Sequence, residues 1–400
     1  MKRDAAFVAC SKTKADRPLA AAALYASPLY RKSLLAALDS AKSVFILSAK
    51  HGVLRLSDRI EPYDTTLKRM PQAERSRWGE DIDRTLDLYV PSRSAVNLFC
   101  GEEYITPLRA SFSRHRYSVH NPLVGQSLGQ RLRTLREMIE EEDHRRLKSR
   151  FDRILHNLWI GQAGGRLISE TTGKQSWPRR GVYFVLDSTV AAASGRMPRI
   201  VRVGTHAVSA GSKTTLWDRL STHRGTTVGS GSHRSSIFRS HVGRALMARD
   251  GLDFSTWGQG QSAPKDIRDQ EQELERKVSD TLGGMRLLWI DIPDDPGAQS
   301  DRAFIERNSI GLLSRLGLLS PTTTKEWLGH YSVEWRISVS GLWNLDHLFL
   351  KPDAKFLDVL KVYVDLTLGR VTQDEAAQLV DKQPHRLAGI DQLTLFSEGN

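Results

Sequence analysis

Three short apolar segments in the second half of the chain place the strongest limit on its fold. They read GVYFVLD (181–187), RIVRVGT (199–205) and RLLWIDI (286–292), and polar or helix-forming stretches separate them. Short runs of β-branched and aromatic residues bounded by polar stretches are typical of buried strands. We therefore predict a small mixed or antiparallel sheet with flanking helices.

Helix-forming stretches after these segments carry charged side chains. The stretch TLWDRLSTH places Arg219 and His223 four positions apart, and therefore on one helix face. After the third segment, FIERNSIGLLS places Glu306 on another helix. The intervening region 225–284 reads as an insertion, because it begins rich in glycine and serine and continues as a basic helix.

This order of strands and helices resembles the GIY-YIG nuclease family. The resemblance rests on Gly181-Val182-Tyr183, on Val203-Gly204 and on the charged residues of the two helices. It implies phosphodiester cleavage with one Mg²⁺ or Mn²⁺ ion. In that family the first tyrosine helps to activate water, an arginine steadies the phosphate and a glutamate binds the metal. These roles fall on Tyr183, Arg219 and Glu306.

Further residues of this region are expected in the same site. His223, on the face of Arg219, is a candidate proton-transfer partner. Asn344, in SGLWNLDHL, occupies the place of a late polar residue that contacts the phosphate in the family. His206 follows Gly204 closely enough to enter the site.

One residue departs from the family pattern. Arg202 stands where the second tyrosine is expected. An arginine cannot accept a proton at neutral pH, so we expect Arg202 to bind phosphate and leave Tyr183 or His223 as the base. The alternative is a nucleic-acid-binding module that has kept the fold and lost the chemistry.

The composition points to a polyanionic partner. The chain has 400 residues, enough for two or three domains, and a formal net charge of +12. Much of that charge lies in and around the insertion, where phosphate contacts are expected; the alternative is a basic surface without a ligand. The candidate nucleic-acid contacts in this half are Arg202, His206, Lys213, Arg224, Arg234, Arg239 and Arg244. Charge and motifs do not separate DNA from RNA.

The first half alternates apolar strands with helix-like stretches, which predicts an α/β domain with a parallel sheet over residues 1–142. Four motifs fall at predicted strand ends, where parallel sheets bind ligands. They are CSKTK (10–14), SAKHGVL (48–54), PYDTTL (62–67) and CGEEY (100–104).

These motifs resemble the glycosylase-like domains of archaeal tRNA-guanine transglycosylase and archaeosine synthase, which are similar to the uracil-DNA glycosylase superfamily. The resemblance implies a pocket for an extruded or modified base. Asp64 is then the candidate to activate water or stabilise an oxocarbenium ion, and His51 the candidate to polarise the base. Base recognition without chemistry and a purely structural role are the alternatives. The expected nucleic-acid contacts here are Ser11, Lys12, Lys50 and Tyr104.

The remaining segments complete the predicted organisation. Residues 143–160 are expected to form a helical linker, residues 161–350 the nuclease-like domain, and residues 351–400 a helical extension with an exposed tail. The tail sequence QLTLF resembles the peptide by which bacterial repair proteins dock on the sliding clamp, through Gln392, Leu395 and Phe396. The alternative is that it packs on the domain.

The sequence also limits the compartment and the chemistry. Cys10 and Cys100 are its two cysteines, which predicts neither a zinc site nor a disulfide. No leader-like apolar segment and no membrane-spanning run are seen, so a cytoplasmic protein is expected. Together these features predict a bacterial DNA-processing enzyme for anti-phage restriction of modified genomes or for repair. An RNA-directed nuclease or modification protein is the rival reading.

Overall fold

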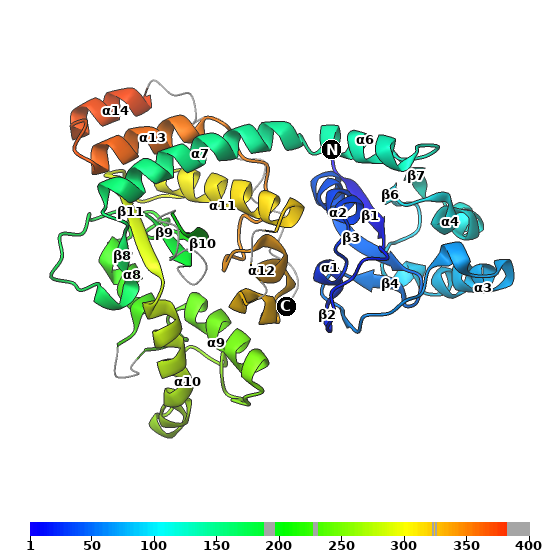
Figure 1. Cartoon of the computed structure of the whole chain (residues 1–400), viewed down its shortest axis with the longest axis horizontal. Coiled ribbons are helices and arrows are strands. Elements are labelled where there is room, and N and C mark those ends of the chain that lie inside the picture. The colour runs from blue at the N-terminus through cyan, green and yellow to red at the C-terminus, as the bar shows by residue number, and fades with distance from the viewer. Residues whose placement is uncertain (188–196, 227–230, 322–323, 325, 382–400) are drawn as a thin grey trace. The chain divides into compact units, whose positions relative to one another are not determined.

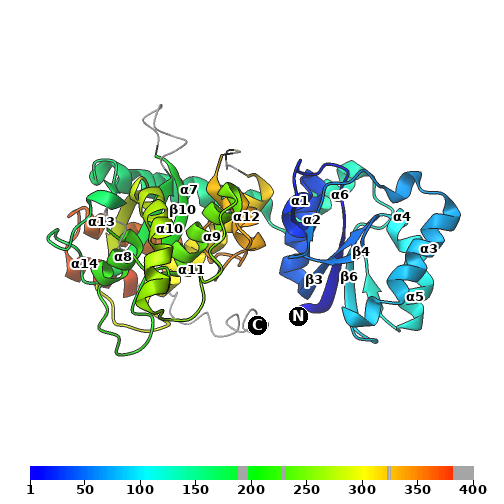
Figure 2. The same cartoon turned by 90° about the horizontal axis from the view of Figure 1, so that it is seen from below.

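The computed structural model describes residues 1–187, 197–226, 231–321, 324 and 326–381. The chain divides into two compact units. The first is formed mainly by Met1–His144, and the second mainly by Arg145–Gly317 together with the described residues from Pro321 onward. Figures 1 and 2 show the elements of each unit in two views. The tail residues Gln392, Leu395 and Phe396 lie outside the described residues.

The first unit is built on a five-stranded sheet of order β4-β3-β1-β6-β7. Neighbours β1 and β3, β1 and β6, and β6 and β7 run parallel, whereas β4 pairs antiparallel with β3. The strands are β1 (Arg3–Ala9), β3 (Ala41–Ser48), β4 (Gly52–Arg55), β6 (Ala95–Phe99) and β7 (Ser118–His120). The predicted parallel α/β domain is confirmed, with one hairpin added. Gly52 makes that hairpin turn possible, since its φ of +70° suits glycine.

Helices and short turns surround this sheet. The helices are α1 (Ala21–Leu24), α2 (Pro28–Ser40), α3 (Gln72–Asp83), α4 (Glu102–Ile105), α5 (Arg109–Arg114) and α6 (Leu128–Met138). A small ribbon pairs β2 (Leu19–Ala20) with β5 (Arg59–Ile60). The 3₁₀ turns are η1 (Leu67–Arg69), η2 (Leu86–Leu88) and η3 (Thr106–Leu108). One side of the core packs Phe7, Leu47 and Leu98 from the three central strands against Trp78 of α3.

The second unit contains the predicted small sheet, and it is antiparallel. Its order is β10-β9-β11-β8, so β9 lies between the two longest neighbours. The strands are β8 (Arg166–Leu167), β9 (Gly181–Asp187), β10 (Arg199–Gly204) and β11 (Arg286–Asp291). Every residue of β9 is buried, which explains why its sequence is almost continuously apolar.

Helices cover this sheet in the second unit. They are α7 (Glu141–Gly161), α8 (Leu216–Arg224), α9 (Ile237–Asp250), α10 (Lys265–Gly283), α11 (Asp301–Leu319), α12 (Trp335–Ser340), α13 (Phe356–Thr367) and α14 (Gln373–Asp381). The 3₁₀ turns η4 (Ile168–Glu170) and η5 (Leu328–Tyr331) join them. Among the described residues, no helix is both long enough and apolar enough to cross a membrane.

The segment predicted as a linker, residues 143–160, lies within α7. Phe151 of this helix has its ring 6.2 Å from that of Phe184 in β9 and 6.2 Å from that of Phe356 in α13. Figure 1 shows α13 beside α7. Because Phe151 is fully buried, α7 contributes to the core of the second unit as well as connecting the chain.

Candidate active site

Two glycines allow the strands of the second unit to approach one another at the site. A Cβ atom on Gly181 would overlap the carbonyl oxygen of Ile290 in β11, and one on Gly204 would overlap the hydroxyl of Tyr183. Tyr183 and Gly204 are register partners on β9 and β10. The glycine of each strand motif is therefore needed for strand pairing and for the position of the tyrosine.

Tyr183 begins a buried chain of hydrogen-bonded side chains. Its hydroxyl lies 2.7 Å from Nε2 of His223 in α8, and Nδ1 of His223 lies 2.7 Å from Oγ of Ser236. All three residues are at most 2% exposed. Tyr183 and His223, the two residues that the sequence analysis named as candidates for the base, are therefore in direct contact. Ser236 was missed, because nothing in the sequence marks a serine at the start of α9 as a neighbour of α8.

The cap of α9 allows the tautomer of His223 that carries its ring proton on Nε2. Ser236 Oγ accepts a hydrogen bond from the backbone N–H of Arg239 at 3.3 Å. Its own proton can then be donated to Nδ1 of His223, which leaves the ring proton on Nε2. That proton points at the Tyr183 oxygen, where it would stabilise a phenolate.

His223 is held neutral by its surroundings. Burial lowers the pKa of His223 well below its ordinary value, and the positive charges of Arg202, Arg219 and Arg239 lower it further. A neutral imidazole with one donor and one acceptor is the form that this chain of hydrogen bonds requires.

Glu306, in α11, provides the carboxylate of the site. Its Oε1 accepts a hydrogen bond from the backbone N–H of Thr205 at 3.1 Å. Burial of the carboxyl group raises the pKa of Glu306 to about 7, although Arg202, Thr205 and Arg219 oppose the rise. The residue as a whole keeps part of its surface accessible. A carboxylate kept from solvent and short of partners suits a divalent cation.

The described residues hold no group of three or more His, Cys, Asp or Glu side chains that could bind a metal. Mg²⁺ is commonly held by one or two carboxylates, with waters and substrate phosphates completing its shell. The buried carboxylate of Glu306, to which the family resemblance assigned the metal, has the chemistry of such a ligand.

Arg219 acts electrostatically on both Glu306 and His206, two other residues predicted for the site. Arg219 is partly exposed, and its buried Nε has no hydrogen-bond partner among the described residues. His206 is buried, and burial together with Arg302 lowers its pKa to about 4. The positive charge of Arg219 thus lowers the pKa of His206 and opposes the rise in the pKa of Glu306.

Arg202 is anchored inside the unit. Its Nη1 donates to the carbonyl oxygen of Trp343 at 2.6 Å, and the guanidinium carbon lies 4.8 Å from the ring centroid of Phe238. Only 6% of the residue is exposed. Arg202 therefore supplies fixed positive charge close to Glu306 and His223.

Asn344 has a different task from the predicted phosphate contact. Its amide pairs with the backbone of Val203, donating to the carbonyl at 2.8 Å and accepting from the N–H at 3.1 Å. The residue is 6% exposed. We therefore leave Asn344 out of the proposed catalytic set.

The structure also changes the predicted role of the arginines in the basic insertion. Arg239 is fully buried and bonds Glu275, with Nε 3.0 Å from Oε2. Arg234 makes a two-pronged pair with Glu271 at 2.5 and 2.8 Å, and its side chain is 6% exposed. These arginines cannot contact phosphate in this arrangement, since carboxylates already occupy their donors. The predicted contacts that keep exposed surface are Lys213, Arg224 and Arg244.

The predicted strand-end residues of the first unit separate into two groups. Lys12, Lys50, His51 and Asp64 are exposed, and Ser11 is partly exposed. Tyr104 is only 6% exposed, with its hydroxyl 3.1 Å from Sγ of Cys10 and its ring against Trp78. Its ring is therefore packed in the protein and does not offer a surface for base stacking.

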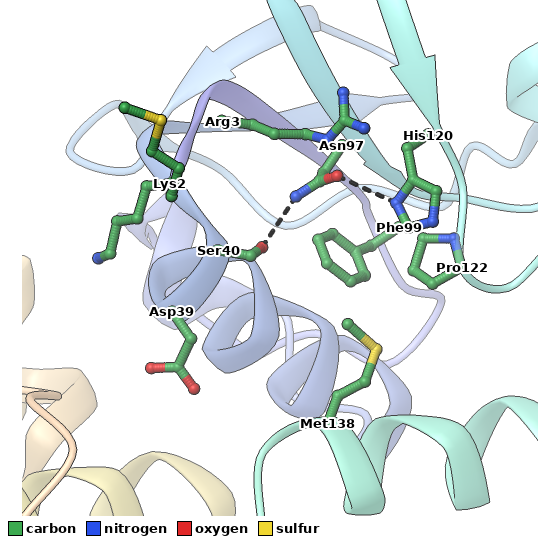
Figure 3. A pocket seen from close by; sticks show the side chains of 10 residues that line it. Lys2, Arg3, Asp39, Ser40, Asn97, Phe99, His120, Pro122 and Met138 are labelled. Atoms are coloured by element: carbon green, nitrogen blue, oxygen red, sulfur yellow. Dashed lines mark hydrogen bonds between the residues drawn. The ribbon is translucent and has the colours of Figure 1, made fainter.

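A separate pocket in the first unit was not predicted. It has a volume of about 410 Å³ and lies between the start of β1, the end of α2, β6, β7 and α6. Figure 3 shows Asn97 reaching toward Ser40 and His120, with Phe99 beside it and Met138 farther off, beyond Phe99. Asn97 Nδ2 donates to Ser40 Oγ at 3.0 Å, and His120 Nδ1 lies 3.3 Å from Asn97 Oδ1.

Comparison with known proteins agrees with this division. Residues 5–137 match a family of unknown function (DUF6884), so the first unit is related to that family and not to a named glycosylase. No curated protein and no solved structure matches the chain. Residues 141–369, more than half of the chain, match the GIY-YIG domain. The chain therefore belongs to the GIY-YIG domain family.

Proposed function

We propose that this protein is a metal-dependent endonuclease whose active site contains Tyr183, Arg219, His223 and Glu306. The observation that carries the proposal is the 2.7 Å contact between the Tyr183 hydroxyl and His223 Nε2, in a unit that belongs to the GIY-YIG family. A hydrogen bond from a neutral imidazole stabilises Tyr183 as a phenolate, and the phenolate, once the hydroxyl proton has been released to solvent, can accept a proton from water.

The other residues have complementary tasks. Arg219, with its unpartnered Nε, would hold the phosphate, and Arg202 would add fixed positive charge. Glu306 would hold one Mg²⁺ or Mn²⁺ ion, which supplies charge that stabilises the pentavalent transition state. Arg219 and Glu306 keep exposed surface, so we expect the substrate to enter from their side.

We further propose that the first unit recognises a base, such as a modified phage base, and directs the nuclease to it. The support is the gathering of polar residues at the carboxyl ends of parallel strands, where such sheets bind ligands. Asp64 and His51 remain the candidates for base excision, and anti-phage defence or repair would be the setting. Docking of the tail on the sliding clamp remains a proposal.

Two other functions remain as rivals. Arg202 favours a binding module without catalysis, because it replaces a tyrosine of the family motif. The positive net charge fits RNA as well as DNA. Both rivals can be tested together with the main proposal.

The test is incubation of the full chain with unmodified DNA, modified phage DNA and RNA, with and without Mg²⁺. We expect Mg²⁺-dependent nicks, and we expect Glu306→Gln to abolish them while binding persists. The control variant is Lys42→Ala, which lies in the other unit. Asn344→Ala is not a suitable control, since Asn344 supports β10. Nicking that is unchanged in Glu306→Gln would remove Glu306 from the site.

The same reactions distinguish base excision from recognition. Abasic sites would be separated from nicks by treating the products with mild alkali. If the first unit excises bases, modified DNA will yield abasic sites with wild type and none with Asp64→Ala. Binding without abasic sites would indicate recognition alone.

A further inference from the structure

A cluster of hydrogen-bond donors lies at the carboxyl ends of β1 and β3 in the first unit. It consists of Lys14, Tyr25, Ser48 and Tyr63, which we call the strand-end cluster. The Tyr63 hydroxyl lies 2.7 Å from Oγ of Ser48 and 2.8 Å from the hydroxyl of Tyr25. The backbone N–H of Cys10 bonds the Leu47 carbonyl at 2.9 Å, which ties the ends of the two strands together.

The hydrogen bonds of Ser48 determine where its proton points. Ser48 Oγ accepts from the backbone N–H of Lys50 at 3.2 Å and from that of His51 at 3.0 Å. Two donors already occupy the oxygen, and Ser48 is fully buried. Its proton is therefore donated to Tyr63.

The hydroxyl of Tyr25 also constrains the hydrogen bonds of Tyr63. Tyr25 is 1% exposed, and a buried hydroxyl needs an acceptor. Tyr63 Oη supplies it, since the oxygen of Ser48 is already occupied. In this arrangement Tyr63 accepts two hydrogen bonds, and no acceptor for its own proton is found among the described residues. Tyr63 is partly exposed, so that proton is available to a ligand.

Lys14 places a positive charge beside this free donor. Its ammonium lies 4.2 Å from the ring centroid of Tyr63 and 5.7 Å from that of Tyr25. The one hydrogen bond found for it among the described residues, to the Lys12 carbonyl, is long at 3.4 Å. Cys10 and Asp64 act on Lys14 electrostatically, but neither Asp64 nor any other described carboxylate lies within ion-pair distance.

We propose that the strand-end cluster binds a phosphate group of a nucleic acid, with the Lys14 ammonium and the Tyr63 hydroxyl as donors. A hydroxyl proton that can be donated outward and an ammonium with one long hydrogen bond favour a ligand that only accepts hydrogen bonds and carries negative charge, as a phosphate does. The inference deepens the proposed recognition function of the first unit and does not require base excision. Lys14, Tyr25, Ser48 and Tyr63 were not predicted as contacts from the sequence.

The two cysteines give a local measurement in the full chain. Cys10 is partly exposed, whereas Cys100 is buried and burial raises the pKa of its thiol. Alkylation of the folded protein should therefore report Cys10, which is close enough to Lys14 to influence its pKa. Thymidine 5′-monophosphate, inorganic phosphate and thymidine are the probes, in the absence of Mg²⁺.

We expect the nucleotide and inorganic phosphate to slow alkylation of Cys10, and thymidine to leave it unchanged. Lys14→Ala and Tyr63→Phe should each raise the nucleotide concentration needed for protection by about tenfold or more. Lys42→Ala is the control, because Lys42 lies at the amino end of β3, away from the cluster at the carboxyl ends of the strands. It should keep the wild-type protection.

Three results would overturn the proposal. The first is protection of Cys10 by thymidine equal to that by the nucleotide, which would indicate a base site. The second is protection by the nucleotide in Lys14→Ala equal to that in wild type. The third is no protection of the wild type by either phosphate probe. Slow alkylation of Cys100 in each variant checks that the fold is intact. Because no cleavage is measured, failure of the nuclease proposal would leave this test unaffected.

Discussion

Arg239 in the second unit and Lys14 in the first contribute equally to the formal charge, yet their surroundings are opposite. Arg239 is fully enclosed, where Glu275, Ser279 and the carbonyl oxygen of His223 occupy its donors. Lys14 is only partly covered and lies against the ring of Tyr63. A basic residue is available to a polyanion only when no internal carboxylate already binds it. The comparison therefore distinguishes a basic residue that supports the fold from one that is available to bind a polyanion.

The enclosed charge has a consequence for the nuclease site. Arg239 Nη1 bonds the His223 carbonyl at 3.1 Å, while Ser236, at the start of the same helix, contacts the His223 ring. The basic helix of the insertion thus fixes the position of α8. Its contribution to catalysis, if the proposal holds, is to position His223.

The largest effect is expected from breaking the enclosed pair. Arg239→Met leaves the Glu275 carboxylate buried without its main partner and should lower the free energy of unfolding by about 3–5 kcal/mol. Lys14→Met should change it by less than about 1 kcal/mol. Urea unfolding of both variants measures the difference. Equal effects at the two positions would contradict the expectation that Arg239 stabilises the fold and Lys14 does not.

The double variant Arg239→Met with Glu275→Leu is the control for this prediction. It removes both charges and should recover much of the stability lost in Arg239→Met. A double variant no more stable than the single one would mean that lost packing, and not an uncompensated carboxylate, accounts for the effect.

A second, smaller effect concerns the pH dependence of stability. The pKa of Glu306 is raised from 4.5 to about 7, so the folded state holds this proton more tightly than the unfolded state. The contribution of Glu306 to stability is therefore favourable below pH 4.5 and is lost as the pH rises toward 7. Glu306→Gln should remove this loss, and unfolding of both proteins across that range measures it.

Titration of histidines also changes the stability over this pH range. The quantity to follow is therefore the difference in the free energy of unfolding between wild type and Glu306→Gln. The pKa values of His206 and His241 are lowered to about 4, which makes stability rise between pH 4 and 6.5. These contributions are present in both proteins and cancel when Glu306→Gln is compared with wild type. At pH 8, Mg²⁺ should raise the melting temperature of wild type only. A rise in both would place the metal elsewhere.

The smallest of these effects is expected at Ser236, which does not touch the substrate. Ser236→Ala should slow Mg²⁺-dependent nicking by about tenfold and shift its pH profile, because His223 loses the partner that fixes its proton. Ser236→Thr keeps the hydroxyl and should retain the wild-type profile. A slower reaction with an unchanged pH profile would indicate only a structural role.

The sequence predicted both sheets because these depend on local patterns. Apolar runs marked β9, β10 and β11, and the glycines marked where Tyr183 would lie. The partners that decide which charges are available could not be predicted. Glu275 lies 36 residues from Arg239, and only the packing of α9 on α10 brings them together. Tyr25 belongs to none of the four motifs placed at strand ends, so its hydroxyl was not expected there.

The hydrogen bonds around Asn344 also bear on how this protein can associate with others. β10 is an outer strand of its sheet, and such strands commonly accept an additional strand from another chain. Here the N–H of Trp343 bonds the Val201 carbonyl at 2.7 Å, and the Asn344 amide pairs with both backbone groups of Val203. This part of the edge is already satisfied from within the chain, so we expect no strand-mediated dimer or aggregate to form there.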